Sequence, residues 1–91
     1  MAVVKIPSGW AASTGGQAQL DLDGPTVGAV LDRLASDHPD MHRRLYAVGG
    51  KRLGSWVNVF VGETNIRDLE HLETPLGPGD DVLVLPAVAG G

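Results

Sequence analysis

The residue with the clearest chemical potential in this 91-residue chain is its last one, Gly91, which follows Gly90 and carries the terminal carboxylate. A free carboxylate is a poor electrophile because resonance and water stabilise it. When the same carboxyl group is joined to AMP as a mixed anhydride, it gains a good leaving group, and a sulfur or amine nucleophile can attack it. Glycine has no side chain, so a diglycine end can enter a narrow channel and approach another group closely. The ending therefore predicts a tail whose tip is activated inside the nucleotide site of a partner protein.

The residues before the diglycine are suited to hold this tip away from a folded body. The apolar stretch from Val82 to Leu85 reads as a last strand, and Pro86 is expected to end it. The predicted organisation is a folded domain over residues 1–85 and a flexible tail over residues 86–91. Six extended residues span about 20 Å, which is enough to reach into a partner. The chain contains no cysteine, so none of its own thiols could capture an activated end.

Other groups that could do chemistry are few and poorly placed. His38 and His42 have a spacing that can bind a metal when both lie on one helix, but Pro39 breaks that helix. No third ligand stands nearby in the sequence, so no metal site is predicted. The loop serines have no local histidine or carboxylate partner, and the glycine pair at 15–16 lacks the lysine and the following helix of a phosphate loop. We therefore do not expect an independent enzyme.

Composition and charge narrow the class of protein further. The 43% apolar and 20% charged content is that of an ordinary soluble globular domain, and the length allows one core. A net charge of -4 argues against nucleic-acid binding, and we interpret Arg43, Arg44, Lys51 and Arg52 as charges of a solvated loop. The longest apolar run, residues 82–89, is far below the ~20 residues that cross a bilayer. The N-terminal apolar run is too short for a signal peptide, so a cytoplasmic protein without a membrane partner is predicted.

Hydrophobic periodicity predicts the elements that must position the tail. Apolar residues with helical spacing form one face behind a plausible N-cap, Thr26. The residues of that face are Val27, Val30, Leu31 and Leu34. The predicted elements are strands at 3–6 and 18–22, a helix that ends before Pro39, and strands at 56–61, 65–67 and 82–85. Residues 40–46 can add a further helical turn.

The order β-β-α-β-β-β predicts an α+β protein of the ubiquitin-like β-grasp type. In that fold a mixed sheet of four to five strands packs on one main helix, and here a flexible C-terminal Gly-Gly tail would follow. A strand–helix–strand unit favours a right-handed crossover that makes two strands parallel. The sheet positions of the second and last strands stay open. A ferredoxin-like sandwich is the alternative, and it would need a second full helix that the pattern does not show.

Strand alternation leaves one choice open near the tail. If Val82 and Val84 face the core, Leu83 and Leu85 face outward and form an apolar strip of the kind that docks a partner. The reverse arrangement has the same periodicity. Trp10 is expected to fold back over the small core rather than to serve as an interface anchor.

Two motifs then point to a family. The segment "GDDVLVLPAVAGG" at 79–91 resembles the ending of the MoaD/ThiS-like sulfur-carrier proteins of the molybdopterin and thiamine pathways, which are ubiquitin-like β-grasp proteins. The segment "PTVGAVLDRL" at 25–34 is similar to the start of that family's helix. The chain length and the ending "LPAVAGG" look most like the actinobacterial carrier type that serves cysteine biosynthesis.

The resemblance implies a role for each tail residue. Gly91 would be adenylated with ATP by a ubiquitin-activating-type enzyme and converted to a thiocarboxylate that donates sulfur. Gly90 and Ala89 would lie in the channel of that enzyme. The positions that would pack against partners are Val88, Pro86 and Leu85. The chain would be a protein co-substrate and not a catalyst, with no cofactor of its own, since the activating partner uses the ATP.

The resemblance also implies partners and leaves the destination of the sulfur open. The expected partners are the activating enzyme and a downstream sulfur-accepting synthase, and a metalloprotease that regenerates the tail is also compatible with the family. The sulfur could serve cysteine, molybdopterin, thiamine or a sulfur-containing secondary metabolite. Two alternatives remain: a ubiquitin-like modifier joined through Gly91 to lysine amines, or a structural subunit whose tail is never activated.

Overall fold

The computed structural model describes residues 2–47, 53–54 and 56–86. In this part of the chain the strands are β1 (Ala2–Lys5), β2 (Gln19–Leu22), β3 (Val57–Val61), β4 (Thr64–Asn65) and β5 (Asp81–Pro86). The α-helices there are α1 (Val27–Asp37) and α2 (Pro39–Leu45). Short 3-10 segments are η1 (Ser8–Thr14), η2 (Ile66–Asp68) and η3 (His71–Glu73).

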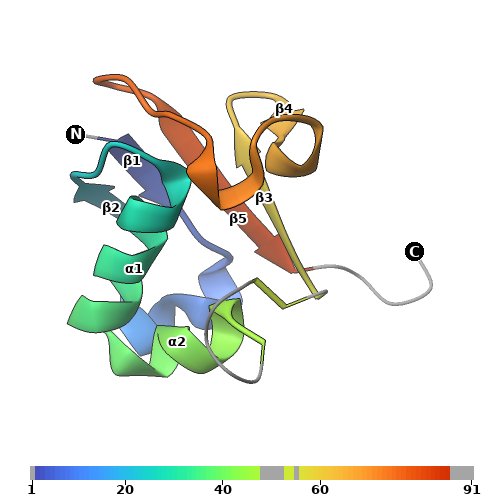
Figure 1. The fold of residues 1–91 in the computed structure, drawn as a ribbon. Coiled ribbons are helices and arrows are strands. Elements are labelled where there is room, and N and C mark those ends of the chain that lie inside the picture. Colours follow the sequence, from blue (N-terminus) through green and yellow to red (C-terminus); the bar gives the residue numbers. More distant parts are fainter. Residues whose placement is uncertain (1, 48–52, 55, 87–91) are drawn as a thin grey trace.

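The strands form one sheet in the order β2-β1-β5-β3-β4, and both α-helices lie on one face of it (Figure 1). β5 is parallel to β1 on one side and antiparallel to β3 on the other. β2 is antiparallel to β1, so β2 and β3, which the helices connect, run in the same direction. This arrangement confirms the predicted ubiquitin-like β-grasp fold and places the second strand at an edge and the last strand in the centre.

Local sequence explains where α1 begins and why its inner face is buried. The Thr26 hydroxyl accepts a hydrogen bond from the Ala29 N–H at 3.2 Å, which satisfies a free donor of the first turn. Pro39 is the first residue of α2, a position where a missing N–H costs nothing. The four residues of the predicted face are all buried, with 0% exposure: Val27, Val30, Leu31 and Leu34.

The core lies between this helix face and the inner face of the sheet. Val59, Val82 and Val84 are buried there, and each aliphatic side chain of this size contributes about 1.5–3 kcal/mol on burial. Tyr46, which follows α2, is also buried, and its hydroxyl donates a hydrogen bond to the Asp32 carboxylate of α1. Burial, together with the hydrogen bond and the charge of Asp32, raises the pKa of Tyr46. The phenol therefore stays protonated and ties the end of α2 to α1.

Two segments differ from the prediction. Residues 40–46 do more than add a turn, because residues 39–45 form α2, a separate helix of seven residues. The strand expected at 65–67 is wrong: β4 ends at Asn65, whose side chain accepts a hydrogen bond from the Arg67 N–H at 2.9 Å and so begins η2. Despite α2, the first and last strands are parallel neighbours, which excludes the ferredoxin-like alternative.

Replacing Thr26 by alanine is expected to lower the free energy of unfolding by about 1 kcal/mol, because the Ala29 N–H loses its acceptor. Urea denaturation followed by circular dichroism measures the change. Thr26→Ser keeps the hydroxyl and is the matched control, with a stability close to that of the wild type. If the alanine and serine variants unfold at the same urea concentration, the capping interaction does not contribute.

Candidate functional site

The predicted tail begins where β5 ends, next to the start of β3. β5 includes Pro86, one residue beyond its expected end, and Pro86 pairs with Val57. In an antiparallel ladder, opposite residues alternate between hydrogen-bonded and non-hydrogen-bonded pairs. The Gly62 N–H donates to the opposite Asp81 carbonyl at 3.0 Å, which makes this a hydrogen-bonded pair. Five residues further along the register, Val57 and Pro86 are therefore a non-hydrogen-bonded pair. Proline is tolerated there because the ladder requires no N–H from it. We call the exposed residues Leu85 and Pro86 the tail root.

Of the six predicted site residues, the structure describes two. Leu85 and Pro86 are described, and the structure brings them together at the end of β5. The other four lie outside the described residues: Val88, Ala89, Gly90 and Gly91.

The structure decides which face of β5 is outward. Val82 and Val84 have 0% exposure and point into the core, whereas Leu85 is 38% exposed and Leu83 is half-buried on the opposite face. The first of the two alternations considered from sequence is therefore confirmed. Leu83 and Leu85 therefore lie on the outer face of β5, and Leu85 is part of the tail root.

Neighbouring strands extend this apolar surface. Leu83 pairs with Phe60 of β3 on one side and with Lys5 of β1 on the other, so their side chains share the outer face. Phe60 is half-buried and Lys5 is exposed. We call Phe60, Leu83 and Leu85 the outer strip. A half-exposed apolar strip that ends at the tail root has the character of a docking surface.

Two tryptophans behave differently near this end of the sheet. Trp10 is half-buried against the core, as predicted, and the guanidinium of Arg44 lies 5.7 Å from its ring centroid. Trp56 is 44% exposed, and its Nε1–H donates to the Arg44 carbonyl at 2.9 Å. No role for Trp56 was predicted. No signal in the sequence could have found it, because its place beside the tail root depends on the register between Val57 and Pro86.

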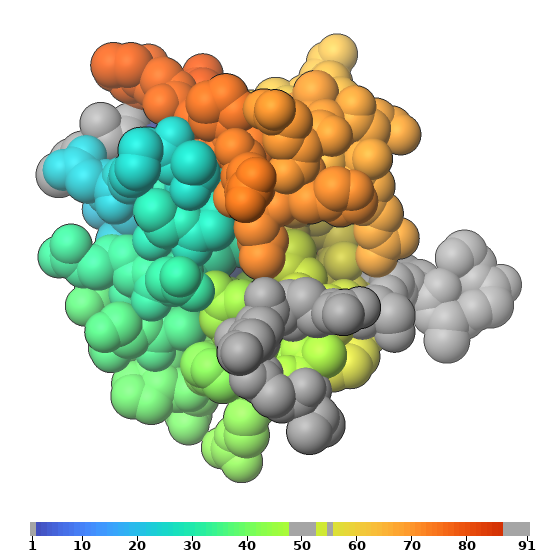
Figure 2. Space-filling model, in the orientation of Figure 1, coloured from blue at the N-terminus to red at the C-terminus, as the bar shows by residue number. Residues whose placement is uncertain are grey.

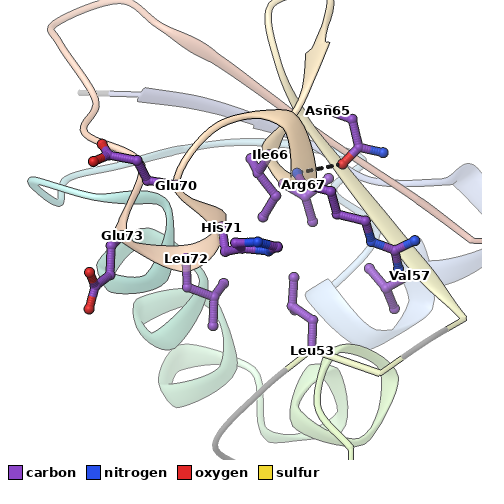
Figure 3. Close-up of a pocket in the computed structure, with 10 residues that line it drawn as sticks. Leu53, Val57, Asn65, Ile66, Arg67, Glu70, His71, Leu72 and Glu73 are labelled. Carbon is purple, nitrogen blue, oxygen red and sulfur yellow. Dashed lines mark hydrogen bonds between the residues drawn. The ribbon is translucent and has the colours of Figure 1, made fainter.

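A cavity of about 480 Å³ opens between β3 and the segment of η2 and η3 (Figure 3). The apolar residues that line it are Leu53, Val57, Val59, Ile66 and Leu72. Figure 3 shows the His71 ring and the Arg67 side chain on the cavity side, whereas the carboxylates of Glu70 and Glu73 point away. None of its described lining residues is a serine, threonine, cysteine or lysine, and in that part of the chain no hydrogen bond joins His71 to a carboxylate.

The wall of this cavity is held against α1, as the contact between the orange and teal segments in Figure 2 shows. A Cβ atom at Gly28 of α1 would lie only 2.9 Å from the Leu72 carbonyl oxygen, so glycine permits the close approach of η3. The buried Thr74 hydroxyl accepts from the Glu70 N–H at 3.0 Å and donates to the His71 carbonyl at 2.7 Å. The close approach at Gly28 and the two hydrogen bonds of Thr74 together fix the segment that carries the polar residues of the cavity.

The histidines considered as metal ligands lie at the junction of the two helices. His42 is exposed on α2, with its ring centroid 5.0 Å from that of Tyr46, and His38 precedes α2. Within the described ranges, no three histidine or acidic side chains are grouped as metal ligands would be. In the same ranges, no helix has the length and apolar character to cross a membrane.

Comparisons with known proteins cover nearly the whole chain. The model of the ThiS family matches residues 4–91. The sulfur carrier protein CysO of Mycobacterium tuberculosis is 36% identical over 89 residues, which are 97% of this chain and 96% of that relative. One chain of the crystal structure of the Amycolatopsis orientalis BexX/CysO complex is 33% identical, with a TM-score of 0.89 and 100% coverage of both chains. The small archaeal modifier protein 1 of Methanosarcina acetivorans is 30% identical, with a TM-score of 0.87 and coverage of 99% of this chain and 95% of that one.

Proposed function

The chain belongs to the ThiS family, and on that premise we propose that this sulfur carrier holds its sulfur as a thiocarboxylate on Gly91. Its role would be that of a protein co-substrate for partner enzymes, not that of a catalyst. The destination of the sulfur follows from the synthase that accepts it, since carriers of one fold can serve several pathways.

Two steps would form the thiocarboxylate. First, a Gly91 carboxylate oxygen attacks the α-phosphorus of ATP in the activating enzyme, and pyrophosphate leaves. Hydrosulfide then attacks the carbonyl carbon of the acyl-adenylate, the carbon–oxygen bond to AMP breaks, and the proton of the hydrosulfide is released. The products are the thiocarboxylate and AMP. Donation of the sulfur and hydrolysis return the Gly91 carboxylate for another cycle.

The observation that carries this proposal is the position of the tail root on the central strand. β5 pairs with β1 on one side and β3 on the other, and its inward residues Val82 and Val84 are buried. Its last two residues, Leu85 and Pro86, are exposed. A well-fixed strand therefore leads directly into residues 87–91, which the proposal places in a partner.

The tail residues would divide the work of binding. Gly90 and Ala89 would occupy the narrow channel of a ubiquitin-activating-type enzyme, where small side chains allow the carboxyl to reach the nucleotide. Val88 and the tail root, Leu85 and Pro86, would pack against the channel entrance. The existence of a BexX/CysO complex for the Amycolatopsis orientalis relative supports assembly with a partner protein. A sulfur-accepting synthase and a tail-regenerating metalloprotease complete the proposed set of partners, in the cytoplasm, where ATP is available.

The experiment that tests the function is an intact-mass measurement. The full chain is incubated with ATP, sulfide and the activating enzyme of its own organism. Replacement of one terminal oxygen by sulfur is the expected result, and its dependence on ATP distinguishes activation from adventitious sulfide chemistry. A chain whose mass stays unchanged under these conditions would contradict the proposal and favour a structural subunit.

Leu85→Ala is expected to raise the KM for the carrier in this assay about tenfold, because it removes the exposed end of the outer strip. Leu69→Ala is the matched control: it also truncates an exposed leucine, which is 42% exposed on the segment between η2 and η3. The control should leave the KM close to that of the wild type. Equal KM values for the two variants would show that Leu85 does not contribute to docking.

A second candidate function is supported by one relative. The small archaeal modifier protein 1 shares this fold over nearly the whole chain, so conjugation of Gly91 to lysine amines is the alternative use of the same activated carboxyl. The two uses differ in the products found in cell extract supplemented with ATP and the activating enzyme. A ladder of larger adducts that contain this chain supports the modifier, whereas the thiocarboxylate alone supports the carrier.

A further inference from the structure

The chain leaves β5 close to the cavity between β3 and the segment of η2 and η3. Directly opposite residues of an antiparallel pair point to the same face of the sheet. Pro86 is opposite Val57, so it shares the inner face with Val57, which is buried and lines the cavity. Neighbouring strands are about 4.8 Å apart. The residues that follow Pro86 therefore begin one strand spacing from the wall of the cavity.

Two side chains on the cavity side can bind an anion. Figure 3 shows the guanidinium of Arg67 beside Val57 and the His71 ring on the cavity side, whereas the carboxylates of Glu70 and Glu73 point away. Arg67 is exposed, and within the described ranges its guanidinium forms no ion pair and no hydrogen bond. A carboxylate that entered the cavity would therefore meet a cation that no described acidic group neutralises.

The backbone holds His71 in a conformation in which its ring lies on the cavity side (Figure 3). Its φ is 54°, in the left-handed region, where a residue other than glycine is uncommon. The Thr74 hydroxyl donates to the His71 carbonyl at 2.7 Å and so stabilises this conformation. Strained backbone of this kind persists only where the surrounding structure maintains it, and it is frequent at binding sites. The wall that carries the imidazole is thus formed before any ligand binds.

We propose that this cavity binds the C-terminal tail of the same chain, with the Gly91 carboxylate paired with the Arg67 guanidinium and hydrogen-bonded by the His71 ring. The inference concerns the carrier while no partner holds its tail. It goes beyond the proposed function and does not depend on the chemistry at Gly91. What it adds is a resting position for the tail on the domain that carries it.

The length and composition of the tail match the cavity. Five residues follow Pro86, and in extended form they span up to about 17 Å, which leaves length for a turn after one strand spacing is crossed. The cavity volume of about 480 Å³ lies within the range of sites that hold small ligands. Apolar wall residues such as Leu53 and Leu72 suit the two alanines and the valine at 87–89. The terminal glycines allow the carboxylate to approach Arg67 closely.

The strength of the pairing suits a tail that must also be released. A guanidinium and a carboxylate can form two parallel hydrogen bonds. Because Arg67 is exposed, such a pair contributes little against water, so the docked tail exchanges with a released one. The short connection raises the local concentration of the carboxylate to the millimolar range, which favours docking within one chain. A partner captures the released tail, and its apparent affinity is reduced in proportion to the released fraction.

The test is nuclear magnetic resonance of the full isotopically labelled chain without any partner. Nuclear Overhauser cross-peaks are expected between the methyl groups of Val88 and those of Ile66 and Leu72, which line the cavity. Arg67→Gln removes the cation and should reduce the intensity of these cross-peaks by more than half, whereas Arg67→Lys keeps the charge and should retain most of it. The methyl shifts of the buried core show whether each variant keeps the fold.

Arg33→Gln is the matched control, since it removes the same charge from an exposed position on α1. Its cross-peaks should have the intensity of the wild type. Absence of the cross-peaks in the wild type, or equal intensities in Arg67→Gln and Arg33→Gln, would overturn the inference. A mixture of labelled and unlabelled chains identifies the tail that is bound, and cross-peaks between two chains would assign the cavity to a second copy and overturn it as well. Sulfur loading of Gly91 is measured separately by intact mass, so either proposal can fail while the other stands.

Discussion

Removal of Gly91 is expected to abolish sulfur loading and to leave the thermal stability of the protein unchanged. The reacting carboxyl would then belong to Gly90, about 3.5 Å short of its position in the channel, and a misplacement of only ~1 Å can cost about 100-fold in rate. The buried residues of β5 end at Val84, and Pro86 is exposed, so the truncation removes no core contact of the described residues. Intact mass after incubation with ATP, sulfide and the activating enzyme measures loading, and circular dichroism measures the Tm.

Gly9→Ala is the control for this truncation. Gly9 lies in η1, and an added Cβ atom would meet nothing within 4 Å, so the variant loses a glycine without altering the tail. It should acquire sulfur at the wild-type rate. A chain without Gly91 that still accepts and delivers sulfur would show that the reacting group lies elsewhere.

Leu34→Ala is expected to lower the free energy of unfolding by about 3 kcal/mol. The Leu34 side chain has 0% exposure between α1 and the sheet, and its loss removes apolar contacts and leaves a cavity. A small domain is stable by about 5–10 kcal/mol in total, so this single change removes a large share of its stability. Urea denaturation followed by tryptophan fluorescence gives the midpoint and the slope from which the change is calculated.

Leu69→Ala serves as the stability control because it truncates the same side chain at a position that is 42% exposed. Its effect should be within about 0.5 kcal/mol. At saturating activating enzyme, the folded fraction of Leu34→Ala should still acquire sulfur, because the change leaves the tail intact. A Leu34→Ala protein as stable as the control would mean that the side chain is not in a close-packed core.

Local signals in the sequence were sufficient for the main elements. Thr26, the helical spacing that follows it and Pro39 define α1 with physical causes that act within a few residues. The alternation in residues 56–61 similarly predicts β3, which runs from 57 to 61. These features depend on residues that are close in the sequence, and hydrophobic periodicity records the order of such residues.

Two features depend on contacts that hydrophobic periodicity does not contain, one of them local and one between distant strands. The end of β4 at Asn65 depends on a side-chain hydrogen bond to the Arg67 N–H, which competes with strand pairing. The continuation of β5 through Pro86 depends on the register with Val57, which alternation alone does not define.

The candidate site shows the same division. Leu85 was predicted as a partner contact, but only its 38% exposure shows that its side chain faces outward. Arg43 and Arg44 were interpreted as charges of a solvated loop, whereas both lie on α2, where Arg43 meets Asp40 and the Arg44 side chain donates to the Ser13 hydroxyl. Arg67 lies at the cavity through the fold of η2, which the sequence pattern did not predict. The roles of Val88, Ala89, Gly90 and Gly91 remain proposals.

The position of β5 between β1 and β3 also has a mechanical consequence. A force applied to the chain beyond Pro86 acts along β5 and loads both of its ladders in shear, the parallel one beside Val3 to Lys5 and the antiparallel one beside Val57 to Val61. The hydrogen bonds of the two ladders lie across the direction of such a pull, perpendicular in the antiparallel ladder and slanted in the parallel one, so they share the load. A strand peeled sideways from an edge would lose its bonds one at a time. A pull on this end of the chain is therefore resisted by both ladders together, and the domain keeps its shape under it.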